Sequence, residues 1–190
     1  MTILSINKTR DLDGRSAPIF FMVIIMNKKV RNLVYGALIA ALYVTLTYMQ
    51  NFLLPNSTSF AIQFRASEAL CVLALFTPAA IPGLTAGCLL FNISSGALPL
   101  DFVIGSAASC LAAGGMYLTR KVTVRSYPLL AMLMPAICNG ILVGWELDYI
   151  MGGGFWLNAF YVAVGELAVL LTLGTALYYA LKKSESRLFG

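Results

Sequence analysis

A few carboxylate and amide side chains interrupt the long apolar stretches of this 190-residue chain. Glu166 lies nine residues into an apolar run that begins at Leu157, which is about 13 Å along a helix axis. An ionised carboxylate at that depth in lipid costs a few kcal/mol, so we expect Glu166 to face a cavity or a polar partner. The alternative is a helix-to-helix hydrogen bond made by a protonated glutamate.

A second acid and an amide share one face of another apolar run. Asn139 and Glu146 are seven residues apart, which places them within about 20° of each other on a helix. Both side chains can therefore point into the same space. Trp145 beside Glu146 is either an anchor of the interfacial aromatic belt or a stacking surface for a ligand. Tyr161 stands above Glu166 on the same run, towards the outer surface.

The remaining polar candidates each have a structural alternative. Asp101 directly precedes an expected helix, where it is either an N-cap or a ligand contact. Asn92 ends another helix, as a cap or as a site residue. Glu68 follows Arg65 by three residues, so the two either form an ion pair on a helix or Arg65 orients Glu68 towards a ligand.

Several kinds of chemistry are excluded by residue types. The chain has no histidine, which removes zinc hydrolases of the usual kind and serine-histidine catalysis. Its four cysteines lie within apolar runs without metal-ligand spacing and are expected to be small buried side chains. The sequence also lacks a Gly-x-x-x-x-Gly-Lys phosphate loop. We therefore expect no catalytic residues, no metal site and no cofactor.

The elements that carry these residues belong to a membrane protein. Hydrophobic residues make up 59% of the chain and charged residues 11%, and the mean hydropathy is +0.83. Soluble domains have about 25% charged residues. We predict an all-α integral membrane fold, a bundle of six transmembrane helices of about 20 residues each. The expected helices cover residues 32–50, 66–76, 83–93, 101–118, 127–145 and 157–181.

Basic residues occur at alternate gaps between the apolar runs. They are Lys28, Lys29 and Arg31, then Arg120, Lys121 and Arg125, and finally Lys182, Lys183 and Arg187. The positive-inside rule places these gaps in the cytoplasm, and with them both termini. The acids of the other gaps, Glu68, Asp101, Glu146 and Asp148, should then face outward.

The chain divides into one membrane domain and two ends. Residues 27–183 form the single six-helix domain, residues 184–190 a cytoplasmic tail, and residues 1–26 an N-terminal extension that is either a mis-assigned start or a flexible arm. Residues 51–64 form an apolar outer connection, which either folds over a cavity as a lid or rests on the membrane surface.

Small residues recur at four-residue spacing on two of the expected helices. Gly36 with Ala40, and Ala37 with Ala41, give the first helix two adjoining registers, and Gly83 with Gly87 give the third helix one. Such registers allow another helix to approach closely. The partner is either a helix of the same bundle or another subunit.

Four stretches of the sequence share their pattern with a known family. They are Gln63 to Leu70 (Gln-Phe-Arg-Ala-Ser-Glu-Ala-Leu), Phe76 to Leu84, Gly87-Cys88 with Asn92, and Asp101 to Gly105. Over residues 32–183 the chain resembles the QueT family, the substrate-binding S components of energy-coupling factor (ECF) transporters that import queuosine precursors. Ala37 and Ala41 match the alanine pair by which the first helix of such proteins docks onto a transmembrane scaffold subunit.

The resemblance implies an importer subunit in the bacterial cell membrane rather than an enzyme. Its partners would be the scaffold subunit, two ATPase subunits and a ligand such as preQ1 or preQ0, with no nucleic acid. Carboxylates can accept the adjacent N–H groups of a 7-deazaguanine base. The candidate ligand contacts are Glu68, Asn92, Asp101, Asn139, Trp145, Glu146, Tyr161 and Glu166. The alternatives are an S component for another small aromatic or cationic vitamin such as thiamin, or a membrane-embedded enzyme acting on lipids.

Overall fold

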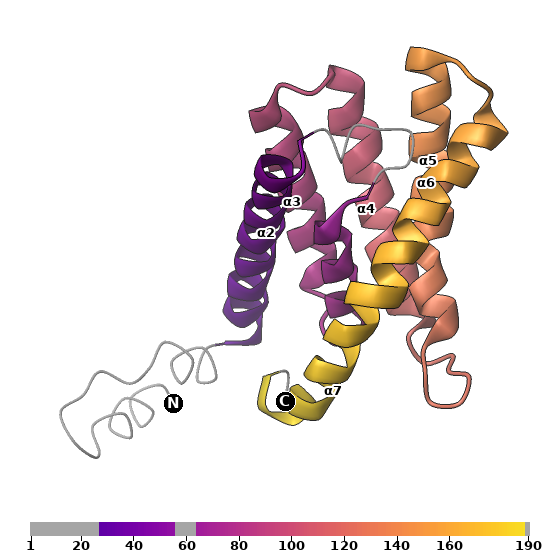
Figure 1. Cartoon of the computed structure of the whole chain (residues 1–190). Helices are drawn as coiled ribbons and strands as arrows, with labels where there is room; N and C mark the ends of the chain where they lie inside the picture. Colours follow the sequence, from indigo (N-terminus) through magenta and orange to yellow (C-terminus); the bar gives the residue numbers. More distant parts are fainter. Residues whose placement is uncertain (1–26, 56–63, 189–190) are drawn as a thin grey trace, which may run out of the picture.

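The computed structural model describes residues 27–55 and 64–188, and these form an all-helical bundle (Figure 1). The elements are α2 (Lys28–Leu53), the 3₁₀ helix η2 (Ala66–Leu75), α3 (Ala80–Ser95), α4 (Pro99–Thr119), α5 (Leu129–Met151), α6 (Phe155–Val169), the π-helical turn η3 (Leu170–Gly174) and α7 (Thr175–Leu188). The last three form one continuous helical segment, so six segments alternate in direction through the bundle. The N-terminal extension and most of the expected lid, residues 56–63, lie outside the described residues.

Within the described residues, four helical segments are long and apolar enough to cross a membrane. They are Lys28–Leu53, Pro99–Thr119, Leu129–Met151 and Phe155–Ser184. The other two apolar helices, Ala66–Leu75 and Ala80–Ser95, are shorter. An all-helical, multi-pass membrane protein is therefore confirmed, whereas six spanning helices and cytoplasmic termini remain predictions.

One error in the predicted boundaries changes the environment of candidate residues, and it concerns the fifth helix. It was expected to end at Trp145, but α5 continues to Met151. Glu146 and Asp148 consequently belong to the helix and not to a loop. The helix ends at three consecutive glycines, residues 152–154, which all have positive φ, a conformation that glycine adopts without steric cost.

The second helical segment lies at the centre of the bundle. Residues 66–76 were expected to form an α-helix, but Ala66–Leu75 is a 3₁₀ helix that contacts every other helix of the described fold. A 3₁₀ helix rises about 2.0 Å per residue against about 1.5 Å for an α-helix, so its ten residues extend about 20 Å rather than 15 Å. Cys71, Val72 and Ala74 are fully buried along it. Its small and medium side chains suit a narrow element that is surrounded on all sides.

Glycines set the distance between α2 and α3. A Cβ atom added at Gly83 would lie 2.7 Å from the backbone oxygen of Gly36, and one added at Gly87 would lie 2.8 Å from the Cβ of Tyr43. The Gly83 and Gly87 register therefore serves packing within the bundle, against the face of α2 that carries Gly36. Ala37 and Ala41 lie on the exposed face of α2.

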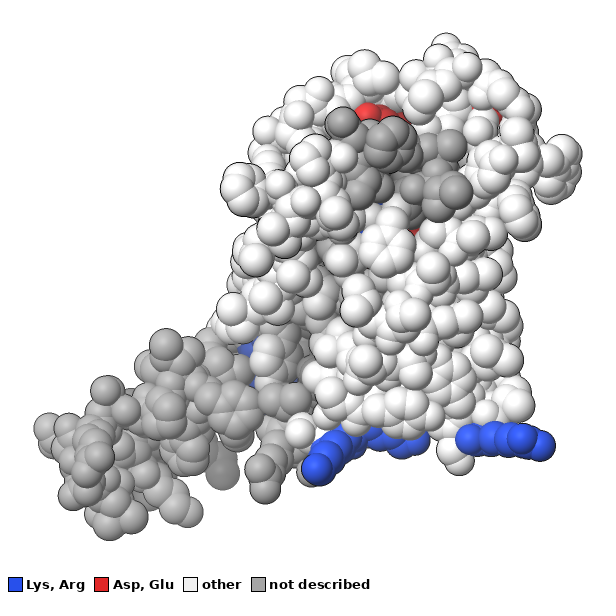
Figure 2. All heavy atoms as spheres, viewed as in Figure 1, with Lys and Arg blue, Asp and Glu red and all other residues white. Residues whose placement is uncertain are grey.

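The charged residues are separated along the bundle. Figure 2 shows Lys and Arg side chains gathered at the end that holds the loop between α4 and α5 and the end of α7, and acidic side chains at the opposite end. The acidic end also holds the glycine turn after α5 and the connection from α3 to α4. A ligand that enters from the acidic end therefore meets carboxylate side chains, whereas Lys and Arg side chains gather at the other end.

Candidate functional site

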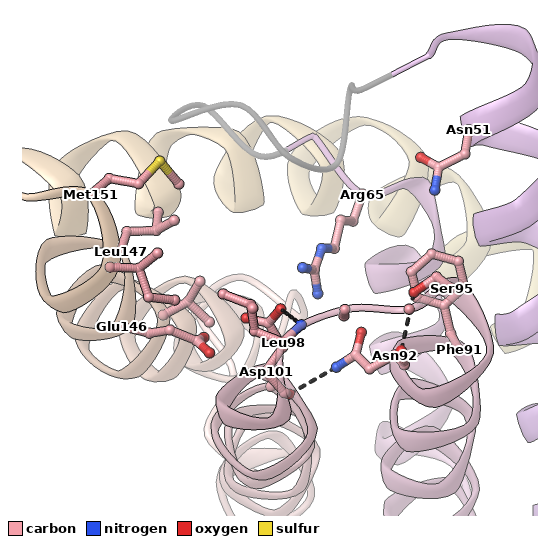
Figure 3. Close-up of a pocket in the computed structure, with 15 residues that line it drawn as sticks. Asn51, Arg65, Phe91, Asn92, Ser95, Leu98, Asp101, Glu146, Leu147 and Met151 are labelled. Atoms are coloured by element: carbon pink, nitrogen blue, oxygen red, sulfur yellow. Dashed lines mark hydrogen bonds between the residues drawn. The ribbon is translucent and has the colours of Figure 1, made fainter.

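A cavity of about 390 Å³ opens at the acidic end of the bundle (Figure 3). The ends of several elements enclose it: the end of α2, the residue before η2, the end of α3, the start of α4 and the end of α5. Its polar lining consists of Asn51, Arg65, Asn92, Ser95, Asp101 and Glu146. Ligand pockets typically have volumes of about 300–1,000 Å³, so this cavity suits a small molecule.

Glu146 is the most unusual residue of the lining. Its side chain is only 3% exposed, and its Oε1 atom is buried with no hydrogen-bond partner among the described residues. Val143, Leu147 and Ile150 surround it on the same face of α5 and line the apolar side of the cavity. Since a buried carboxylate oxygen without a partner is unfavourable, Glu146 is well suited to accept a hydrogen bond from a bound ligand.

Asp101 lies on the first turn of α4 and interacts electrostatically with Glu146. The expectation that Asp101 directly precedes the helix is wrong, because α4 begins at Pro99. The Asp101 carboxylate accepts the backbone N–H of Leu98 at 2.9 Å, so it caps the helix from inside the first turn. Two carboxylates thus share one cavity wall.

Asn92 connects α3 to α4 at the floor of the cavity. Its side-chain amide donates to the backbone oxygen of Asp101 at 2.8 Å, and the residue is 3% exposed. The helix continues past Asn92 to Ser95 and ends at Gly96, which has a φ of 72°. Asn92 is therefore inside α3, not at its end, and its side-chain oxygen remains as a further polar group of the lining.

Arg65 points into the cavity from the side opposite Glu146 (Figure 3). Its Nε atom is buried without a hydrogen-bond partner in the described part of the chain. Burial lowers the pKa of the guanidinium, while acidic groups around it raise that pKa above its ordinary value. These groups are Tyr43, Cys88, Glu68 and Glu166. Arg65 therefore carries a positive charge into the cavity that the two carboxylates line, a direct role that the sequence did not predict.

Glu68 has a different environment from the one expected. It is 1% exposed and does not belong to the lining of the cavity. The hydroxyl of Tyr43 donates to its Oε1 at 2.7 Å, and the thiol of Cys71 lies 3.3 Å from its Oε2. Glu68 thus holds η2 to α2 within the interior.

Asn139 and Glu166 pair with each other across α5 and α6. The Asn139 amide donates to Glu166 Oε1 at 2.6 Å, and both residues are buried and outside the lining of the cavity. Asn139 and Glu146 do share a helix face, but seven residues separate them by about 10 Å along the axis. Their side chains consequently have different surroundings: Asn139 is hydrogen-bonded to Glu166, and Glu146 lines the cavity.

Neither aromatic candidate from the sequence lines the cavity. Trp145 is 47% exposed and stacks on Tyr149 with ring centroids 5.8 Å apart, which fits an aromatic belt at the membrane surface. Tyr161 is half-buried beside Phe160. The aromatic ring of the lining is Phe91, which also packs edge-on against Tyr48 at 5.1 Å. Phe91 directly precedes Asn92 in the sequence, and this proximity to a candidate site residue was the signal that could have identified Phe91.

Within the described ranges, no group of three or more His, Cys, Asp or Glu side chains could hold a metal ion. The site instead offers two carboxylates, a guanidinium and an amide around an apolar hollow. Such a set can bind a small polar molecule by charge and hydrogen bonds.

Comparison with known protein families shows that the family model of QueT transporters matches residues 33–183. No curated protein and no solved structure matches the chain. The matched region includes all or most of each helix of the bundle and every residue of the cavity lining. QueT proteins are transporters and not enzymes, which removes the alternative of a lipid-modifying enzyme. Because the match spans most of its length, the chain belongs to the QueT transporter family.

Proposed function

We propose that this chain is the substrate-capture subunit of an ECF importer and that it binds a queuosine precursor, a 7-deazaguanine such as preQ1 or preQ0. The observation that carries the proposal is the cavity at the acidic end, with Glu146, Asp101 and Arg65 around it. Membership of the QueT family supports a transport role and the class of ligand.

The cavity chemistry is complementary to such a base. A carboxylate such as Glu146 accepts two adjacent N–H groups of the pairing edge, and the guanidinium of Arg65 donates to a carbonyl or ring nitrogen. Asn92 adds an amide that can donate or accept. Phe91 supplies an aromatic surface next to this polar set. The direct contacts that we propose are these four residues together with Asp101.

The charges of the lining are complementary to a cationic group on the ligand. Asp101 and Glu146, when ionised, contribute two negative charges and Arg65 contributes one positive charge, so the described lining carries a net charge of −1. The aminomethyl group of preQ1 is a cation and would neutralise this charge. We place that group next to Asp101, at the opposite end of the ring system from the pairing edge that Glu146 accepts.

The interior pairs have a supporting role in this proposal. Glu68, hydrogen-bonded by Tyr43, and Glu166, hydrogen-bonded by Asn139, are buried polar groups that fix the packing of η2, α5 and α6. Trp145 and Tyr161 lie outside the lining of the cavity and are not among the contacts that we propose.

Transport then requires other subunits. The chain takes up the ligand from outside the cell with both termini in the cytoplasm, and the scaffold subunit docks on the face of α2 that carries Ala37 and Ala41. Both alanines are exposed, as a docking face requires. Two ATPase subunits supply the energy, and the complex resides in the bacterial cell membrane.

A ligand panel tests the proposal. The full chain is purified in a mild detergent, and its thermal unfolding is measured with preQ1, preQ0, guanine and thiamin. We expect a rise in Tm with the 7-deazaguanines and a smaller or absent rise with guanine and thiamin. Stabilisation by thiamin alone would favour a thiamin S component, and no response to any of these ligands would refute the proposal.

A further inference from the structure

A second cavity, of about 130 Å³, lies at the basic end of the bundle. It is lined by Leu75 and Phe76 at the end of η2, by Arg120 and Pro128 from the connection between α4 and α5, and by Tyr178 and Lys182 of α7. No carboxylate belongs to this lining as far as the structure describes it. Two cationic side chains and an apolar wall therefore face the same small space.

Arg120 is held in place by the preceding turn of α4. Its guanidinium carbon lies 3.6 Å from the ring centroid of Tyr117, and Nη1 donates to the backbone oxygen of Tyr117 at 2.5 Å. A guanidinium has five N–H donors in a fixed planar arrangement. The contacts with Tyr117 use one face and one nitrogen of this group, and they hold the charge at the edge of the cavity.

Lys182 is fixed on the other side of the cavity. Its Nζ donates to the hydroxyl of Tyr178 at 3.1 Å and to the backbone oxygen of Ser126 at 3.4 Å. The Tyr178 hydroxyl lies 3.4 Å from the same oxygen of Ser126. Two groups, one from α7 and one from the connection between α4 and α5, thus position the ammonium.

The turn that presents the Ser126 oxygen has an unusual backbone. Arg125 and Ser126 have φ values of 50° and 65°, in the left-handed region that residues other than glycine rarely adopt. Hydrogen bonds between Val124 and Tyr127 in both directions, at 2.9 and 3.0 Å, close the turn around them. Strained residues of this kind are often found at functional sites, and here the strained turn contacts a lining residue of the cavity.

We propose that this cavity binds the phosphate of an anionic phospholipid headgroup. The flanking helices cross the membrane, so the cavity lies at the boundary between lipid and water, at the end where the basic residues gather (Figure 2). The guanidinium of Arg120 matches two phosphate oxygens, and Lys182 adds a point charge. Leu75, Phe76 and Pro128 contact the glycerol side of the lipid. Basic pockets between membrane helices are a known way to recognise anionic headgroups.

The test uses the full chain purified in a neutral detergent. Native mass spectrometry counts retained phosphatidylglycerol and phosphatidylcholine, and thermal unfolding is followed with each lipid and with inorganic phosphate. We expect one phosphatidylglycerol retained per chain and a rise in Tm with phosphatidylglycerol only. Equal retention of both lipids, or the same rise in Tm with inorganic phosphate, would overturn a specific lipid site.

Matched variants separate this site from general surface charge. R120Q and K182Q should each weaken phosphatidylglycerol retention about tenfold, as the loss of a charge-assisted contact predicts. K121Q removes the same charge from an exposed position next to the cavity and should leave retention unchanged. R120K keeps the charge without the planar fork and should be intermediate. If K121Q weakens retention as much as R120Q does, or if all variants bind normally, the cavity is not the site.

Discussion

The side-chain amide of Asn139 donates to Glu166 Oε1 at 2.6 Å, and this bond joins α5 to α6 inside the bundle. The other carboxylate oxygen of Glu166, Oε2, is buried without a hydrogen-bond partner among the described residues. A single amide therefore provides the side-chain hydrogen bond of a buried carboxyl group. Its loss would leave that group without compensation.

We predict that Asn139→Ala destabilises the protein by about 1–3 kcal/mol, the penalty for leaving a buried polar group unpaired. The measurement is the free energy of unfolding in detergent. Ile137→Ala on the same helix is the control, because Ile137 is 46% exposed and its truncation should cost little. A variant at Asn139 as stable as the wild type would show that the pair contributes nothing to the fold.

Ligand binding should depend on Glu146. We expect Glu146→Gln to weaken preQ1 binding about tenfold to a hundredfold, which corresponds to the roughly 1.5–3 kcal/mol of a hydrogen bond to a charged group. The Tm of the unliganded variant should be unchanged or higher, because the substitution removes a buried carboxyl group whose Oε1 has no hydrogen-bond partner among the described residues.

Asp148→Asn is the matched control for Glu146→Gln. Asp148 lies on the same helix outside the lining of the cavity, and its Oδ1 accepts the backbone N–H of Gly154 at 2.9 Å. Asparagine keeps that acceptor and removes the same charge. Isothermal titration of both variants distinguishes a specific contact from a general effect of negative charge, and equal losses in the two would argue against a direct contact by Glu146.

The contact between α2 and α3 should not tolerate a methyl group. We expect Gly83→Ala to destabilise the bundle by about 1–3 kcal/mol, in the range of overpacking substitutions, because the new Cβ would lie 2.7 Å from the backbone oxygen of Gly36. Gly114→Ala adds the same methyl group on α4, where nothing lies within 4 Å, and should stabilise by up to about 1 kcal/mol through helix propensity. Thermal unfolding of the two variants should therefore shift in opposite directions. A stabilising effect at Gly83 would mean that α2 and α3 are not packed this closely.

Substitutions on the exposed face of α2 should affect assembly with the scaffold subunit and leave ligand binding unchanged. We predict that Ala37→Trp abolishes co-purification with the scaffold subunit while the Tm shift caused by preQ1 stays unchanged, because Ala37 is exposed and lies outside the cavity. Ile137→Trp, at an exposed position of α5, should leave co-purification intact. Loss of ligand binding in the Ala37 variant would instead place this residue in the fold or in the site.

The sequence alone determined the class of the protein, because composition and hydropathy depend on residue types and not on their arrangement. In lipid, a long apolar run can satisfy the hydrogen bonds of its backbone N–H and C=O groups only as a helix or in a closed barrel. Runs of this length indicate helices. The sequence also identified polar residues that lipid would not tolerate, and the separation of Arg120 and Lys182 from Glu146 along the chain already indicated opposite ends. Helix periodicity placed Asn139 and Glu146 on one face.

Only the tertiary structure decided which polar groups meet. Glu146, Asp101, Asn92 and Arg65 come from four elements whose ends converge around one hollow, and no local spacing encodes that convergence. Asn139, on the same face as Glu146, instead meets Glu166 because α6 runs alongside α5 at that depth. A helix face fixes the direction of a side chain, but its partner is set by the neighbouring helix and by the height at which the two helices touch.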